Sequence, residues 1–161
     1  MEDISTLTKR RLQAAVIKPI YEELVIILGD EEAQSIIGKA IRKAAISEAR
    51  EFSDDAPGGV TSLQSFIDLF ELWMAEDALE VIFLEKTETH FSFDVTRCKY
   101  AETYREMEIE HIGHLLSCNR DGSFCEGYDT NIKLDRTQTI MGGASCCTFR
   151  YRYETSFSDE S

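Results

Sequence analysis

The sequence has few basic residues and no long apolar segment. Only 17 lysines and arginines face 30 aspartates and glutamates in 161 residues, which gives a formal net charge of −13. Binding to nucleic acids and to anionic membrane surfaces depends on clustered lysine and arginine. The longest apolar runs, such as residues 24–28, are far shorter than the roughly 20 residues that a membrane-spanning helix needs. We therefore expect neither a nucleic acid nor a membrane as a partner.

The sequence also lacks a secretory signal, because its opening, MEDISTLTKRR, has no apolar segment after the basic residues. We therefore expect a cytoplasmic protein, whose thiols stay reduced. The number of cysteines is odd, and all five lie in the second half of the chain: Cys98, Cys118, Cys125, Cys146 and Cys147. Such cysteines in a reducing compartment are more often metal ligands, reactive thiols or small core residues than a disulfide framework.

Several specific catalytic motifs are absent. The chain has no glycine-rich phosphate loop, no paired Cys-x-x-Cys motif and no Gly-x-Ser-x-Gly nucleophile elbow. With 2 prolines, 43% hydrophobic and 29% charged residues, it has the composition of an ordinary globular protein. The length suits a single domain over residues 1–161, and a homo-oligomer is compatible with the sequence.

Residues 1–78 are predicted to be mainly helical. The clearest helical pattern is an apolar stripe formed by Ala33, Ile36, Ile37, Ala40, Ile41 and Ala44. An earlier stripe, which we expect Pro19 to bend, consists of Leu12, Ala15, Val16, Ile20, Leu24 and Ile27. Residues 53–59 combine turn formers with charge and predict a break between helices.

Residues 79–153 are predicted to contain the sheet and the candidate site, followed by a tail at residues 154–161. The predicted strands are residues 79–84, 89–95, 132–141 and 146–153, the last two joined by a turn at Gly142 and Gly143. Helical pieces are predicted at 97–107 and 109–118, and a loop at 119–131. We therefore expect an α+β fold, with a helical N-terminal half packed on a small antiparallel sheet of about four strands.

Two thiols occupy positions that suit chemistry. Cys98 falls in the first turn of a predicted helix, beside Arg97, where the helix N-terminus and the cation favour a thiolate; a small core residue is the alternative. Cys118 lies between an apolar segment and a polar turn, which suits a nucleophile or a ligand at the edge of a cleft. The nearby Asp121 suits a general base or an acceptor that orients water, although it could also cap the turn.

Other thiols and the histidines have weaker patterns. Cys147 shares its predicted strand face with Phe149, which by itself favours the core. His111, His114 and Cys118 are spaced by three and four residues, so a helix would place them on one face that resembles a zinc site. A solvated His111 is the alternative.

Arginines are notable in so acidic a chain, because a guanidinium holds a carboxylate in a bidentate fork. Those that stand out are Arg97, Arg120, Arg136, Arg150 and Arg152. Arg136, Thr137 and Thr139 lie on one predicted strand with Arg150 on its partner, and together they could form an anion pocket. Cross-strand pairing with glutamates is the alternative.

Three segments of the second half carry a family pattern. They read DVTRCKYAETYREM at 94–107, LLSCNRD at 115–121 and LDRTQTIMGGASCCTFRY at 134–151. In this order they resemble the L-2-amino-thiazoline-4-carboxylic acid hydrolase family, and the resemblance spans residues 90–153. It implies a hydrolase that opens a 2-aminothiazoline ring, a cyclic amidine, to N-carbamoyl-L-cysteine. Water adds to the C2 carbon, and the ring sulfur leaves as a thiol.

The resemblance also implies a site at the matching positions, which are Cys98, Cys118, Asp121, Arg136, Thr137, Thr139, Cys147 and Phe149. It thereby moves Cys147 from the core to the site. In the mechanism that follows, Arg136, with Arg97, binds a small carboxylate-bearing substrate. Cys118 attacks the ring, and Asp121 positions the water that resolves the adduct.

Two alternatives remain open at this point. In the first, Cys98, Cys118 and Cys147 hold a metal whose bound water attacks the ring, although no cofactor is otherwise predicted. In the second, the chain is a binding module that senses a small ligand, a metal or the redox state without turnover.

Overall fold

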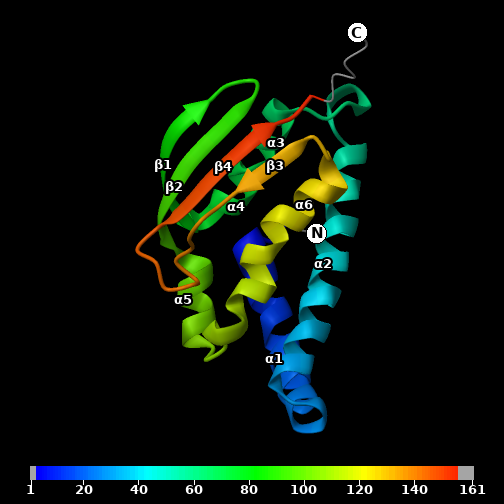
Figure 1. Ribbon diagram of the computed structural model, residues 1–161, viewed down its shortest axis with the longest axis vertical. Helices are drawn as coiled ribbons and strands as arrows, with labels where there is room; N and C mark the ends of the chain where they lie inside the picture. The colour runs from blue at the N-terminus through cyan, green and yellow to red at the C-terminus, as the bar shows by residue number, and fades with distance from the viewer. Residues whose placement is uncertain (1–2, 156–161) are drawn as a thin grey trace.

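The computed structural model describes residues 3–155, and it begins with two long antiparallel helices (Figure 1). They are α1 (Thr6–Leu28) and α2 (Asp30–Asp54). The turn between them is a single residue, Gly29, whose φ of 86° lies in the left-handed region that favours glycine. A break at Pro57–Gly59 then leads to α3 (Leu63–Leu69) and α4 (Glu71–Met74), so the helical N-terminal half is confirmed.

The two long helices bury narrower faces than their apolar spacing predicts. In α2 the buried residues recur every fourth position, at Ala33, Ile37, Ile41, Ala45 and Ala49. In α1 the buried residues are Arg10, Ala14 and Tyr21. The predicted α1 face is wrong, because Leu12, Val16, Ile20 and Ile27 are exposed. The helix continues through Pro19.

Four strands form one antiparallel sheet in the order β1-β2-β4-β3. Their bounds are β1 (Leu79–Lys86), β2 (His90–Cys98), β3 (Ile132–Asp135) and β4 (Cys147–Tyr153). The buried face consists of Phe91, Phe93, Val95, Cys147, Phe149 and Tyr151, which confirms the predicted alternation. Two aromatic residues pack on this face, Phe66 from α3 and Phe70, the residue that ends it. The ring centroid of Phe66 lies 4.9 Å from that of Tyr151, and the centroid of Phe70 lies 4.6 Å from that of Phe93. The predicted α+β fold is confirmed.

The predicted loop at residues 119–131 is wrong, because residues Asn119–Tyr128 form the helix α6. Its glycines and polar residues suggest a loop when they are considered locally. In the structure, one of these glycines allows α6 to pack closely against α2. A Cβ atom at Gly127 would lie 2.3 Å from the carbonyl oxygen of Ile46, so a larger residue would push the two helices apart.

The predicted pairing of the last two strands is confirmed, because β3 pairs antiparallel with β4. The tight turn predicted at Gly142 and Gly143 is wrong, because it does not join the two strands directly. β3 ends at Asp135, and residues 136–146 form an irregular connection that returns to β4. The first predicted helical piece is α5 (Lys99–Glu106), which begins only after Cys98. The second is a short turn at Glu110–Ile112 followed by a π-helical segment at His114–Cys118.

The predicted tail at residues 154–161 is described only at residues 154 and 155, which have no regular structure; residues 156–161 lie outside the described part. Within residues 3–155, no helix has the length and apolar character that crossing a membrane requires.

Candidate functional site

A cavity of about 70 Å³ lies where the sheet meets the helices. Two hydrophobic clusters meet at this point. One is centred on the sheet and α3, the other on α1, α5 and the π-helical segment, and both contact Leu79 and Cys98. The lining is mainly apolar and includes Phe70, Trp73, Val95 and Phe149. The few polar and ionisable groups in the cavity are therefore the candidates for binding or chemistry.

Three thiols line this cavity: Cys98, Cys118 and Cys147. They are three of the positions that the family resemblance selects. Cys98 ends β2 and accepts a hydrogen bond from the backbone N–H of Ala101 at 3.4 Å, so it caps α5. Cys147 begins β4 and accepts one from the N–H of Ile140 at 3.1 Å. Cys125 and Cys146 do not line the cavity.

Cys118 lies at the end of the π-helical segment, just before α6. π-Helical turns are rare, and they occur frequently at functional sites. Cys118 also lines a second, open groove of about 470 Å³, together with Arg136. These two residues therefore lie between the cavity and the wider groove.

Burial keeps the cavity thiols protonated. It raises the pKa of Cys98 to about 11 and the pKa of Cys118 well above its ordinary range. The pKa of Cys147 is raised for the same reason. The prediction that the start of a helix favours a Cys98 thiolate is therefore wrong, because the cost of burying the charge outweighs the hydrogen bond from Ala101.

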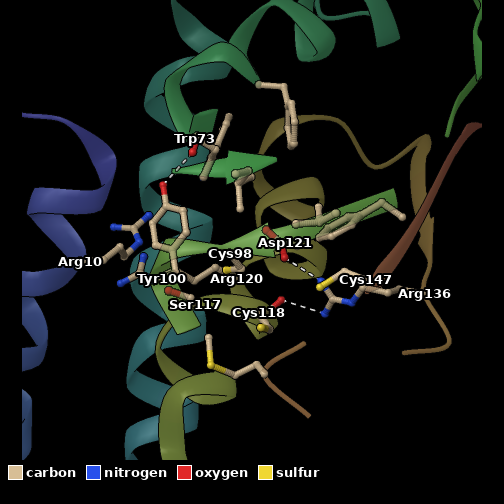
Figure 2. A pocket seen from close by; sticks show the side chains of 15 residues that line it. Arg10, Trp73, Cys98, Tyr100, Ser117, Cys118, Arg120, Asp121, Arg136 and Cys147 are labelled. Carbon is tan, nitrogen blue, oxygen red and sulfur yellow. Dashed lines mark hydrogen bonds and ion pairs between the residues drawn. The ribbon is translucent and has the colours of Figure 1, made fainter. Parts of the chain in front are cut away.

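Asp121 and Arg136 form an ion pair at one end of the cavity (Figure 2). Arg136 donates to Asp121 Oδ2 at 2.7 Å and to the carbonyl oxygen of Cys118 at 3.0 Å. Its guanidinium also lies over the Phe149 ring, 4.9 Å from the centroid. Burial raises the pKa of Asp121, and Arg136 opposes this shift. The carboxyl keeps 25% of its side-chain surface accessible.

Arg10 and Arg120 line the opposite end, on the Tyr100 side of the cavity (Figure 2). Both are buried, with 6% and 7% of their surface exposed. They donate to the same oxygen, Gln13 Oε1, at 3.2 and 3.3 Å, and Arg120 also donates to the Leu116 carbonyl at 2.9 Å. Arg120 stood out among the arginines of the sequence. Arg10, in the run Lys9–Arg11, has the local pattern of a solvated helix face and gave no signal.

Three predicted substrate-binding residues lie outside the cavity lining. Arg97 is 49% exposed and pairs with Glu102 at 2.8 Å. Thr137 is exposed, and its hydroxyl lies 3.1 Å from that of Thr148. The half-buried Thr139 accepts a hydrogen bond from the N–H of Gly142 at 3.0 Å. These three residues are therefore close to the cavity residues in the sequence, but they do not line the cavity.

The predicted metal arrangements are not assembled either. Within residues 3–155, no group of three histidines, cysteines, aspartates or glutamates is arranged to hold a metal ion. This covers both the set Cys98, Cys118 and Cys147 and the set His111, His114 and Cys118. His111 is exposed and lies against Tyr21, with ring centroids 5.6 Å apart.

The fold and the site together define an α+β domain with a mainly apolar cavity that carries thiols, one carboxyl group and guanidinium groups. The chain belongs to the L-2-amino-thiazoline-4-carboxylic acid hydrolase family, whose model matches residues 9–151. The resemblance found in residues 90–153 is thereby confirmed and extends into the helical half. No curated protein matches the chain significantly.

Two solved structures show the same fold at low sequence identity. One is the phenol-responsive sensory domain of the transcription activator PoxR with phenol, at 15% identity and a TM-score of 0.55, covering 93% of this chain and 77% of that chain. The other is trafficking protein particle complex subunit 3 from Naegleria fowleri, covalently bound to palmitic acid. It has 10% identity and a TM-score of 0.52, covering 92% of this chain and 96% of that chain.

Proposed function

We propose that this protein is a hydrolase that opens the ring of a small, carboxylate-bearing cyclic amidine, such as 2-aminothiazoline-4-carboxylate, inside the cavity lined by the three thiols. The observation that carries the proposal is that the Cys118 thiol and the Asp121 carboxyl line one cavity. A nucleophile and a proton acceptor are the two groups that such a ring opening requires. Family membership supplies the reaction class.

The first step forms a covalent adduct. Asp121 accepts the proton of the Cys118 thiol as the sulfur attacks the C2 carbon of the ring. The bond between C2 and the ring sulfur breaks, and the ring sulfur leaves with the proton that Asp121 held. The product of this step is an isothiourea on Cys118 that carries a free thiol at its far end.

The second step hydrolyses the adduct. Water attacks the isothiourea carbon and gives one proton, through Asp121, to the departing Cys118 sulfur. Its other proton stays on the nitrogen of the new urea. The product is an N-carbamoyl amino acid with a free thiol, and Cys118 returns to its starting form.

The raised pKa values support this assignment. A general base works best when its pKa lies near the working pH, and burial raises the pKa of Asp121 towards that range. Burial also keeps Cys118 as an unreactive thiol until a base removes its proton in the presence of substrate.

The cavity must enlarge when substrate enters. Its volume of about 70 Å³ is smaller than the ~150 Å³ that accommodates benzene in an engineered protein cavity. Cys118 and Arg136 line both the cavity and the wider groove beside it. We infer that substrate enters from the groove when the Arg136 side chain moves.

The test is a product assay on the purified chain with 2-aminothiazoline-4-carboxylate, which follows the new thiol and the carbamoyl product. We expect turnover by the wild type and by the control Cys125→Ala, whose thiol lies outside the cavity lining. Cys118→Ala should be inactive. Absence of product from the folded wild type, or full activity of Cys118→Ala, would contradict the proposal.

A ligand-sensing domain is the second candidate, and the apolar lining of the cavity favours it. A similarly folded protein is described as a phenol-responsive sensory domain with phenol. A sensor should gain thermal stability from a cavity ligand such as phenol, because a ligand that binds only the folded state stabilises it. Stabilisation by ligands without product from any cyclic amidine would favour the sensor over the hydrolase.

A further inference from the structure

The cavity carries an excess of positive charge. Three arginines line it, namely Arg10, Arg120 and Arg136, whereas Asp121 is its one lining carboxyl group. Within residues 3–155, the only other carboxyl group within ion-pair distance of these arginines is that of Glu48. Three cations therefore face two anions, in a chain whose formal net charge is −13.

The excess charge lies at one end of the cavity. Arg136 has a partner of its own, Asp121, at 2.7 Å, and its other terminal nitrogen donates to the carbonyl of Cys118. Arg10 and Arg120 share Glu48, at 3.6 and 3.5 Å. Strong charge-assisted hydrogen bonds are shorter, at about 2.7–2.9 Å, so Glu48 compensates these two cations only weakly.

An uncompensated buried cation is costly, and it usually has an anionic partner. Both guanidinium groups are more than nine-tenths buried, so bulk water screens them little. Burial, together with the neighbouring Arg10, lowers the pKa of Arg120 to about 10. The lowered pKa means that the surroundings disfavour the charged form of Arg120. A small monoanion in the cavity would balance the charge.

We propose that Arg10 and Arg120 form an anion subsite that takes the carboxylate of a small ring-bearing ligand, while Arg136 remains paired with Asp121. The identity of that ligand as the substrate rests on the proposed function. Cys98 lies between the two ends of the cavity, so a ligand held by its carboxylate at the Arg10–Arg120 end would present its ring to the thiols (Figure 2). Guanidinium groups match a carboxylate in geometry and charge.

The test measures binding without turnover. The two probes are thiophene-2-carboxylate and its uncharged analogue thiophene-2-carboxamide, titrated calorimetrically into the full chain at low ionic strength. We expect the wild type to bind the carboxylate about tenfold or more tightly than the carboxamide, as one charge-assisted contact provides. In Arg120→Gln this preference should disappear.

Glu48→Gln keeps the test decisive if Arg120→Gln fails to fold. It removes the one anion that Arg10 and Arg120 share, so we expect tighter carboxylate binding, by about threefold or more, and unchanged carboxamide binding. The double variant Asp121→Asn with Arg136→Gln removes the neutral pair without changing the net charge. It should keep the carboxylate preference.

Three results would overturn the subsite: equal affinity of the wild type for the two probes, no gain in Glu48→Gln, or loss of the preference in the double variant. The last result would place the carboxylate at Arg136 instead. A kept preference in a protein that never releases product would overturn the hydrolase proposal alone. Turnover without any preference would overturn the subsite alone.

Discussion

The two charged ends of the cavity are built differently. At one end Asp121 and Arg136 form a short one-to-one pair, so the carboxyl group and the cation are matched. At the other end Arg10 and Arg120 share Glu48 through longer contacts. A matched pair leaves no net charge in the cavity when its two side chains move together, whereas two cations with one anion attract a further anion. The difference supports the two proposed roles, with the reaction at the first end and recognition of the substrate carboxylate at the second.

The largest expected effect is on turnover, and it comes from a change at the Asp121–Arg136 end alone. Asp121→Asn removes the proton acceptor, so turnover of 2-aminothiazoline-4-carboxylate should fall about a thousandfold. Binding of thiophene-2-carboxylate at the Arg10–Arg120 end should persist. Steady-state kinetics and calorimetry measure the two quantities. Asp135→Asn is the matched control, because that carboxyl is exposed and lies outside the cavity. Wild-type activity in Asp121→Asn would remove the proton-transfer role.

A second prediction tests whether the Asp121–Arg136 end depends on its pairing. Arg136→Gln leaves the Asp121 carboxylate without its cation, which should lower the free energy of unfolding by about 3 kcal/mol at pH 8. The loss should be smaller at pH 5. Without Arg136 the folded-state pKa of Asp121, already raised by burial, rises further, and stability from a raised pKa is lost as pH increases.

Urea unfolding at the two pH values measures this effect. Arg152→Gln, whose ion pairs are more exposed, is the control and should cost less than about 1 kcal/mol. A loss in Arg136→Gln that is equal at both pH values, or larger at pH 5, would contradict the account of the pair.

The third prediction concerns Cys98, which lies between the two ends. Because burial raises its pKa to about 11, the thiolate fraction at pH 8 should be about a hundredfold lower than in the unfolded chain. Alkylation of Cys98 by iodoacetamide, followed by peptide mass spectrometry, should therefore accelerate about tenfold per pH unit from pH 8 to pH 10. A rate that levels off near pH 9 would show an ordinary thiol.

The smallest expected effect concerns Arg97, which the sequence placed in substrate binding. This side chain is 49% exposed and already paired with Glu102 and Glu80. Arg97→Gln should change the affinity for thiophene-2-carboxylate by less than about twofold, since exposed charges contribute little. A tenfold loss of affinity in this variant would move the recognition end away from Arg10 and Arg120.

Much of the fold follows from local patterns in the sequence. The period-two alternation of Phe91, Phe93 and Val95 predicted the buried face of β2 because that face depends on strand geometry alone. The helix α6 could not be predicted in the same way. Its glycines predict a loop locally, and the helix depends on packing against α2, which Gly127 allows. Nor could the spacing in α1 show which side of the helix its partners would cover.

The site was predictable to a similar degree. The family pattern selected eight positions, of which Thr137 and Thr139 lie outside the cavity lining. The other six line the cavity: Cys98, Cys118, Asp121, Arg136, Cys147 and Phe149. Arg10 was missed because it precedes the matched segments and lies in a basic run typical of a solvated surface. Only the three-dimensional fold brings it beside Arg120, 110 positions later in the chain. The raised pKa values were missed as well, because burial is a property of the whole fold.

The central claim is that Cys118 opens the ring by forming a covalent adduct, and the most direct measurement detects that adduct. The protein is mixed with 2-aminothiazoline-4-carboxylate, quenched with acid during the first turnovers, and mapped by peptide mass spectrometry. The account predicts a peptide containing Cys118 that is heavier by one whole substrate molecule, and no such peptide in Cys118→Ala. Product formation by the wild type with an unmodified Cys118 at every time point, and equal product from Cys118→Ala, would contradict it.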